Sequence, residues 1–257
     1  MIRLPETSIE GLIVSILLEP PATPRPGSAA NGRPLRPAEP GCWIIPTSAL
    51  SLDGFRAWVT SDDFPEKTRV TYVDQEIYLD KSKEDLITHA AVKAEVSRVL
   101  LQLVRERGLG RLMLDGILVT NEKAGVSNNP DGVFLSLNGL QSDRFRFLPS
   151  ARNEDRSVEI EGAPDWVLEI VSDSSVQKDT VKLRHAYFQA GIPEYWLIDA
   201  RGNVVSFDVL GPGTDGYEPT PVEDGWRFSQ AFGRAFRLER RQDAFGWEYT
   251  LEIKEVT

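Results

Sequence analysis

Residues 163–199 constrain the fold of this chain more than any other stretch. Two apolar runs, at 166–171 and 195–198, flank a segment that is predicted to be helical from about 176 to 190. Gly191 follows at the position where a glycine commonly ends a helix. Two apolar runs joined by an amphipathic helix are typical of a β-α-β crossover, whose parallel strands are buried on both faces. The sequence therefore predicts a β-α-β unit at the centre of an α/β fold.

One carboxylate, Glu169, interrupts the first apolar run. A buried charge is costly unless a partner compensates it, so this residue needs an explanation. Asp131 follows Pro130 at the start of another apolar strand. Two acids on neighbouring strands could bind a hard divalent cation if both point to the same face of the sheet. The structural alternatives are a turn aspartate and a strand-edge glutamate that faces solvent.

Two lysines begin the helix that follows Glu169. Lys178 and Lys182 are four residues apart and therefore share one helix face. A lysine beside two acids would complete a hydrolytic site, because its charge can hold an attacking water or offset charge that develops on phosphorus. The competing interpretation is an exposed helix face, where most helical lysines lie.

Composition excludes several other classes of site and protein. One cysteine cannot form an internal disulfide framework and fits a reducing cytoplasm, and two histidines with that cysteine do not make the usual zinc site. The apolar stretch at 11–18 is too short to span a bilayer, so no membrane association is expected. No glycine-rich phosphate-binding motif is present, which argues against an NTP-driven enzyme. The net charge of −10 does not by itself predict a nucleic-acid partner.

The order of several short motifs resembles the Uma-type restriction endonucleases, a branch of the PD-(D/E)XK nuclease superfamily. The motifs are Pro130-Asp131, Glu169 with the serine-rich loop to Ser175, Asp179, Lys182, Tyr187, and Gly191-Ile192-Pro193-Glu194-Tyr195-Trp196. The resemblance covers about residues 48–210. It implies an α/β (α+β) core with a mixed central sheet flanked by helices, and Mg²⁺-dependent (or Mn²⁺-dependent) hydrolysis of DNA phosphodiester bonds. It assigns metal binding to Asp131 and Glu169.

The resemblance places the catalytic lysine less directly. The superfamily's usual position, two residues after the second acid, falls on Val171, whereas this branch carries the lysine on the following helix, which points to Lys182. Counting back from Gly191, the position expected for that lysine holds Leu183. Lys178 is therefore a second candidate, and loss of the catalytic lysine is an alternative.

Two further residues resemble family positions outside the core motifs. Glu76 lies on a predicted hairpin and is a candidate metal or water ligand, and His89 lies in a predicted long helix. For both residues a structural role is the preferred interpretation. The other predicted elements are the hairpin at 69–79, the long helix at 82–107 capped by Ser82 and Asp85, strands at 111–120 and 131–137 separated by a loop at 121–130, and an excursion at 138–162 with one edge strand at 144–148.

These observations predict three regions and one principal function. Residues 1–47 form an N-terminal arm with a Pro/Gly-rich linker at 19–41, residues 48–210 form the nuclease domain, and residues 211–257 form a β-rich extension packed on that domain. We expect a cytoplasmic, metal-dependent DNA endonuclease that forms a homodimer, since cutting both strands needs two sites. The alternative is a catalytically inactive nuclease-fold module that binds nucleic acid or protein, which the net charge of −10 favours. A hydrolase of small phosphate esters is a third possibility.

Overall fold

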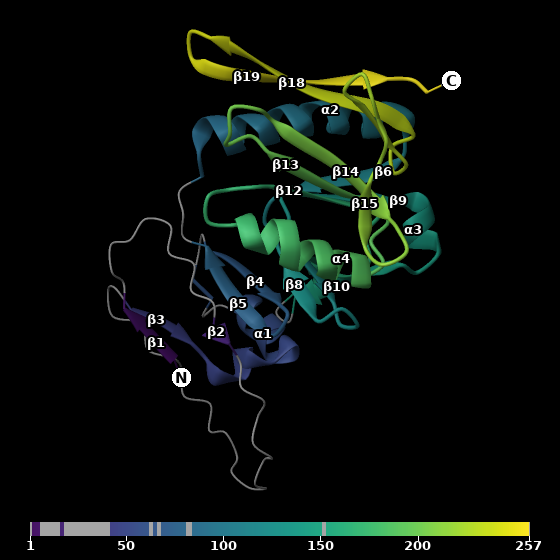
Figure 1. The fold of residues 1–257 in the computed structure, drawn as a ribbon. Helices are drawn as coiled ribbons and strands as arrows, with labels where there is room; N and C mark the ends of the chain where they lie inside the picture. The colour runs from purple at the N-terminus through teal and green to yellow at the C-terminus, as the bar shows by residue number, and fades with distance from the viewer. Residues whose placement is uncertain are drawn as a thin grey trace, which may run out of the picture.

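The computed structural model describes residues 2–5, 16–17, 42–61, 64–65, 68–80, 84–150 and 153–256. The predicted linker at 19–41 lies outside these residues. A six-stranded mixed sheet lies at the centre, with helices on both faces, which confirms the predicted α+β architecture (Figure 1). Its strands, in spatial order, are β15 (Tyr217–Pro219), β14 (Ser206–Pro212), β13 (Tyr195–Asp199), β12 (Trp166–Ile170), β9 (Gly132–Ser136) and β6 (Gly110–Leu114).

Two further sheets and a strand pair complete the β-structure. The second sheet contains β10 (Phe145–Ser150), β11 (Asn153–Gly162), β7 (Leu118–Asn121), β8 (Val126–Asn128), β4 (Arg69–Val73), β5 (Glu76–Asp80) and β2 (Ile16–Leu17). The third contains β16 (Val222–Glu223), β17 (Trp226–Ser229), β18 (Arg234–Asp243) and β19 (Gly246–Lys254). β1 (Ile2–Pro5) pairs with β3 (Cys42–Ile45).

The helices are short except for one. They are η1 (Thr47–Leu50), α1 (Leu52–Val59), η2 (Leu86–Ala90), α2 (Ala91–Arg107), α3 (Leu137–Gln141), η3 (Lys178–Leu183) and α4 (Arg184–Gln189). η2 and η3 are π-helical turns that lead directly into α2 and α4. No helix in the described ranges is both long and apolar enough to cross a membrane.

The predicted β-α-β unit forms as expected. β12 and β13 pair in parallel, and the chain between them is helical from 176 to 189. Side chains alternate along β12, so that Trp166 and Leu168 pack towards α2 while Val167 and Val171 pack towards α4. Glu169 has the same parity as Val167, and it therefore lies on the face of the sheet that α4 covers.

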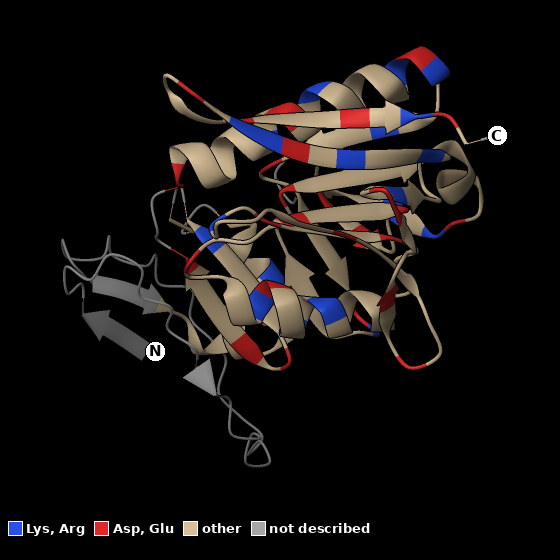
Figure 2. Ribbon diagram, turned by 45° about the horizontal axis from the view of Figure 1, so that its top comes forward, with Lys and Arg blue, Asp and Glu red and all other residues tan. Residues whose placement is uncertain are grey.

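Layers of different kinds cover the two faces of the central sheet. The apolar side of α2 packs on one face, and β18 and β19 cross over the outer side of α2 (Figure 1). α4 and the second sheet lie against the other face. Lysines and arginines alternate with acidic residues along β18 and β19 (Figure 2), and cross-strand pairs such as Arg237–Glu252 and Arg241–Glu248 neutralise that outer surface.

Several boundaries differ from the sequence prediction. The predicted strand at 111–120 is broken by positive φ angles at Asp115 (49°) and Gly116 (67°), and its halves, β6 and β7, belong to different sheets. The predicted loop at 121–130 contains β8, and the excursion at 138–162 contains the long strand β11. β11 was missed because its sequence is mostly polar and its residues 155–158 are exposed, as expected where one sheet face meets solvent.

The long helix begins later than predicted. Asp85 is its N-cap, with its carboxylate accepting the backbone N–H groups of Ile87 and Thr88, and Ser82 lies outside the described residues. The helix ends at Gly108, which adopts a left-handed conformation (φ 60°) that glycine tolerates without strain. Its start is important because it brings His89 and Lys93 to the central sheet.

Candidate active site

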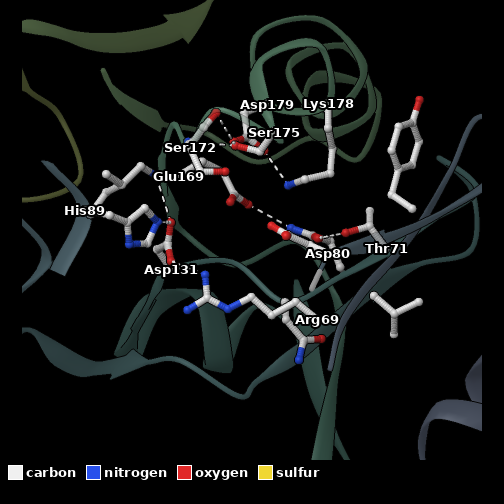
Figure 3. A pocket seen from close by; sticks show the side chains of 15 residues that line it. Arg69, Thr71, Asp80, His89, Asp131, Glu169, Ser172, Ser175, Lys178 and Asp179 are labelled. Atoms are coloured by element: carbon white, nitrogen blue, oxygen red, sulfur yellow. Dashed lines mark hydrogen bonds and ion pairs between the residues drawn. The ribbon is translucent and has the colours of Figure 1, made fainter. Parts of the chain in front are cut away.

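A polar pocket opens between the central sheet and the second sheet. Its walls come from five places in the chain: the hairpin of β4 and β5, His89 in η2, the end of β8 with the start of β9, the end of β12 with its serine-rich loop, and the first turn of η3. Figure 3 shows that Asp131, Glu169 and Lys178 all project into this space. Three of the sequence-predicted site residues therefore meet, although they lie on three different elements.

The two acids lie opposite each other on neighbouring strands. β9 and β12 are antiparallel, with Leu168 paired to Gly132, and the next step of the same register brings Glu169 opposite Asp131. Directly opposed residues of antiparallel strands share one face of a sheet. The backbone N–H of Ile170 donates a 2.8 Å hydrogen bond to Asp131 Oδ2 and fixes this carboxylate. The condition for a shared cation, that both acids face the same way, is met.

Glu169 is buried among neutral hydrogen-bond donors. Its Oε1 accepts bonds from Asn128 Nδ2 (2.7 Å) and from the Tyr187 hydroxyl (2.7 Å), and Thr71 in turn donates to Asn128 Oδ1. Within the described chain, no hydrogen bond reaches Glu169 Oε2. Burial raises the pKa of Glu169 to about 8, an effect that the Lys178 ammonium opposes and the charge of Asp179 reinforces.

Asp131 has the opposite electrostatic environment. His89 Nε2 lies 3.4 Å from Asp131 Oδ2, and Lys93 Nζ lies 2.9 Å from Oδ1. Burial alone would raise the pKa of Asp131, but the hydrogen bond and charge of His89 and the charge of Lys93 hold it well below its usual range. Asp131 is therefore ionised at neutral pH.

Lys178 and Lys182 share one face of the helix but lie at different heights along its axis. Lys178 lines the pocket and donates to the carboxylate of Asp179. Lys182 stands about 5–6 Å further along the helix, one turn away. There it bonds Asp74 in the β4–β5 turn and lies 3.7 Å from Glu76 Oε2. Of these two lysines, Lys178 is the one that lines the pocket with the two acids.

Glu76 accepts the hydroxyl of Tyr78 and lies beside Lys182 at the turn end of the hairpin, so it does not line the pocket. This position separates it from the two acids with which the sequence analysis grouped it. His89, for which we considered a structural role, is a direct neighbour of Asp131.

Several residues of the site were not singled out in the sequence. Arg69, Asn128 and Thr71 line the pocket, and Lys93 supports Asp131 from behind. One signal existed for Lys93, since it follows His89 by four residues and must share its helix face. Arg69 and Thr71 gave no comparable signal, because strand pairing between distant segments brings them to the site.

The donor set fits a hard divalent cation. Mg²⁺ is usually held by one or two carboxylates and keeps several waters. Glu169 Oε2 has no hydrogen-bond partner in the described chain, and Asn129, which lines the same pocket, likewise has a buried Oδ1 without one. No cluster of three or more His, Cys, Asp or Glu side chains with metal-site geometry occurs among the described residues. Any cation here would rest on two carboxylates and water.

A comparison with protein-family models identifies a family that covers most of the chain. A family model, Uma2, described as "Putative restriction endonuclease", matches residues 52–240, which include every pocket residue named above. No curated protein sequence matches the chain.

Proposed function

This chain belongs to the Uma2 family of "putative restriction endonucleases", and we propose that it hydrolyses DNA phosphodiester bonds with a divalent cation, Mg²⁺ or Mn²⁺, bound at Asp131 and Glu169. The observation that carries the proposal is the meeting of these two carboxylates across β9 and β12, with Lys178 beside them. By contrast, carboxylates such as Glu239 and Glu248 form ion pairs with arginines on the exposed surface of the third sheet.

Each pocket residue has a distinct part in the proposal. A bound cation would supply Lewis-acid stabilisation of the charge on the phosphoryl oxygens. The Ile170 N–H and His89 hold Asp131 in place, while Asn128 and Tyr187 orient Glu169.

Lys178 acts by its charge in this proposal. Burial would lower the pKa of its amine, but the charges of Asp179 and Glu169 raise it above the ordinary value for lysine. The ammonium form is therefore the one available at neutral pH, so Lys178 is suited to stabilise negative charge on phosphorus and not to accept a proton.

A cleavage assay on supercoiled plasmid tests this proposal. Wild type, Glu169→Gln, Asp131→Asn, Lys178→Ala and Lys182→Ala would be compared in Mg²⁺, Mn²⁺ and EDTA. We expect metal-dependent nicking that falls at least about 100-fold in the first three variants, as for loss of an electrostatic catalytic group. Lys182→Ala is the matched control, because it removes the same charge one helical turn away, and it should retain most of the activity.

The results decide between the proposal and its alternative. Absence of nicking with every metal would favour a catalytically inactive nuclease-fold module that binds nucleic acid or protein. Equal loss in Lys178→Ala and Lys182→Ala would contradict the role given to Lys178. The proposal includes a homodimer, since one pocket cuts one strand at a time. The homodimer would be supported if linear product forms before nicked circles accumulate.

A further inference from the structure

Arg69 reaches the pocket from the first residue of β4 and lies beside Asp131 (Figure 3). Its guanidinium nitrogens approach Glu84, Asp115 and Asp131, each at 3.7 Å, which is too long for a hydrogen bond. No described residue accepts a hydrogen bond from this guanidinium. The donors of Arg69 are therefore unused, although the side chain points into a polar pocket.

Lys93, and not Arg69, makes the close contacts to these acidic neighbours. Its ammonium binds the same three carboxylates at 2.8 Å (Glu84), 3.0 Å (Asp115) and 2.9 Å (Asp131). The Lys93 side chain is 9% exposed and sits behind the carboxylates, whereas that of Arg69 is 45% exposed. One cation thus supports the acids, and the other remains open to a ligand.

We infer that Arg69 grips a phosphate of the nucleic acid on the Asp131 side of the pocket. This inference rests on the proposed function, which brings a phosphodiester to Asp131 and Glu169. A guanidinium presents five N–H donors in a planar fork that matches two phosphate oxygens, and it keeps its charge at any working pH. Lys178 enters from η3 near Glu169, and Arg69 enters from β4 near Asp131 (Figure 3). A phosphate at the carboxylates would therefore meet one cation near each carboxylate.

DNA binding tests this inference separately from cleavage. Fluorescence anisotropy of a short labelled duplex would be measured in Ca²⁺ over a series of NaCl concentrations. We expect Arg69→Gln to bind about tenfold more weakly or worse. It should also reduce the slope of log affinity against log salt by about one, the effect of one lost phosphate contact. Arg241→Gln is the matched control: it removes the same charge from an exposed strand of the third sheet and should leave affinity and slope unchanged.

Arg69→Lys covers the possibility that Arg69→Gln folds poorly. It keeps the charge but loses the fork, so it should retain the salt slope and bind severalfold more weakly than wild type. A purely structural role would lower the melting temperature and leave the salt slope unchanged, which would overturn the inference. Failure of wild type to bind DNA would overturn it as well. Binding that depends on Arg69 without any cleavage would support the inference and contradict only the catalytic proposal.

Discussion

Asp131 and Glu169 share one pocket, but their surroundings shift their pKa values in opposite directions. Asp131 faces His89 and Lys93 and is held ionised. Glu169 faces an amide and a phenol, and burial keeps it protonated up to about pH 8. Without a cation, the pocket therefore avoids placing two carboxylate charges side by side. A bound cation would instead favour the ionised form of Glu169, because a cation binds the carboxylate and not the carboxylic acid.

The first prediction concerns folding stability. The pKa of Glu169 is about 8 in the folded protein and near the ordinary glutamate value of 4.5 in the unfolded chain. Between pH 4.5 and 8 the folded protein holds one more proton, on Glu169, than the unfolded chain does. The contribution of protonated Glu169 to stability is therefore present below pH 4.5 and is lost as pH rises towards 8. Each pH unit costs about 1 kcal/mol. In EDTA, Glu169→Gln should therefore be more stable than wild type at pH 8, and the difference should shrink towards pH 5.

Denaturant unfolding at several pH values measures this effect. Glu106→Gln, at an exposed position on α2, is the control and should not change the pH dependence. A Glu169→Gln variant that is less stable than wild type at pH 8 would mean that the ionised carboxylate is compensated in the apo protein.

The second prediction concerns cation binding. Since Glu169 is protonated at pH 7 and must ionise to bind a metal, Mn²⁺ binding should release about one proton. Calorimetric titration in two buffers of different ionisation enthalpy would detect this proton. Glu169→Gln should bind weakly and release none. Equal Mn²⁺ affinity in wild type and Asp131→Ala would show that Mn²⁺ does not bind in this pocket.

Some site residues could be predicted from the sequence and others could not. Glu169 was found because apolar neighbours predict a buried carboxylate, and strand order predicted its proximity to Asp131. The choice between Lys178 and Lys182 could not be made, because both share a helix face and only the height along the axis differs. Arg69 lies on a strand more than fifty positions before Asp131, and no local sequence pattern there indicates that it reaches the site.

The elements were predictable where their contacts are local. The β12–α4–β13 unit follows from periodicity and a terminal glycine within one continuous segment. β8 and β11 were missed, although each pairs with the strand just before it, β7 and β10, because both strands are mostly polar and carry little apolar content. The π-helical turns η2 and η3 were not predicted either, although each carries a pocket residue, as such turns often do at functional sites.

The third prediction concerns the start of the long helix. Asp85 caps it through the N–H groups of Ile87 and Thr88 and the Thr88 hydroxyl. Asp85→Ala should lower stability by about 1 kcal/mol, the usual loss for an N-cap. Asp85→Asn retains an acceptor and is the control. Since His89 lies in the first turn after this cap, Asp85→Ala should also reduce plasmid cleavage more than its loss of stability explains. A cleavage rate equal to that of Asp85→Asn would contradict this coupling.

Residues of the C-terminal region belong to the main hydrophobic core. Phe232, Phe236, Tyr249 and Leu251 are buried in one cluster with the apolar stripe of α2 and the inner residues of β12 and β13. α2 is therefore enclosed between the central sheet and the third sheet (Figure 1). We propose that residues 211–257 are a required layer of the nuclease domain and not a separable module.

The fourth prediction follows from this enclosure. Phe236 is fully buried and packs edge-on against Trp196 of the central sheet, with ring centroids 4.9 Å apart. Phe236→Ala should cost about 3–5 kcal/mol, a large share of the total stability of a typical domain. Phe245→Ala is the matched control, because its side chain is 91% exposed in the β18–β19 turn, and it should change stability by less than about 0.5 kcal/mol. Chemical denaturation measures the stability of both variants.

A fragment that ends at residue 210 exposes the whole outer side of α2 and should not unfold cooperatively. If it did, with wild-type stability, the third sheet would be an independent unit, and the 48–210 region would be the complete nuclease fold.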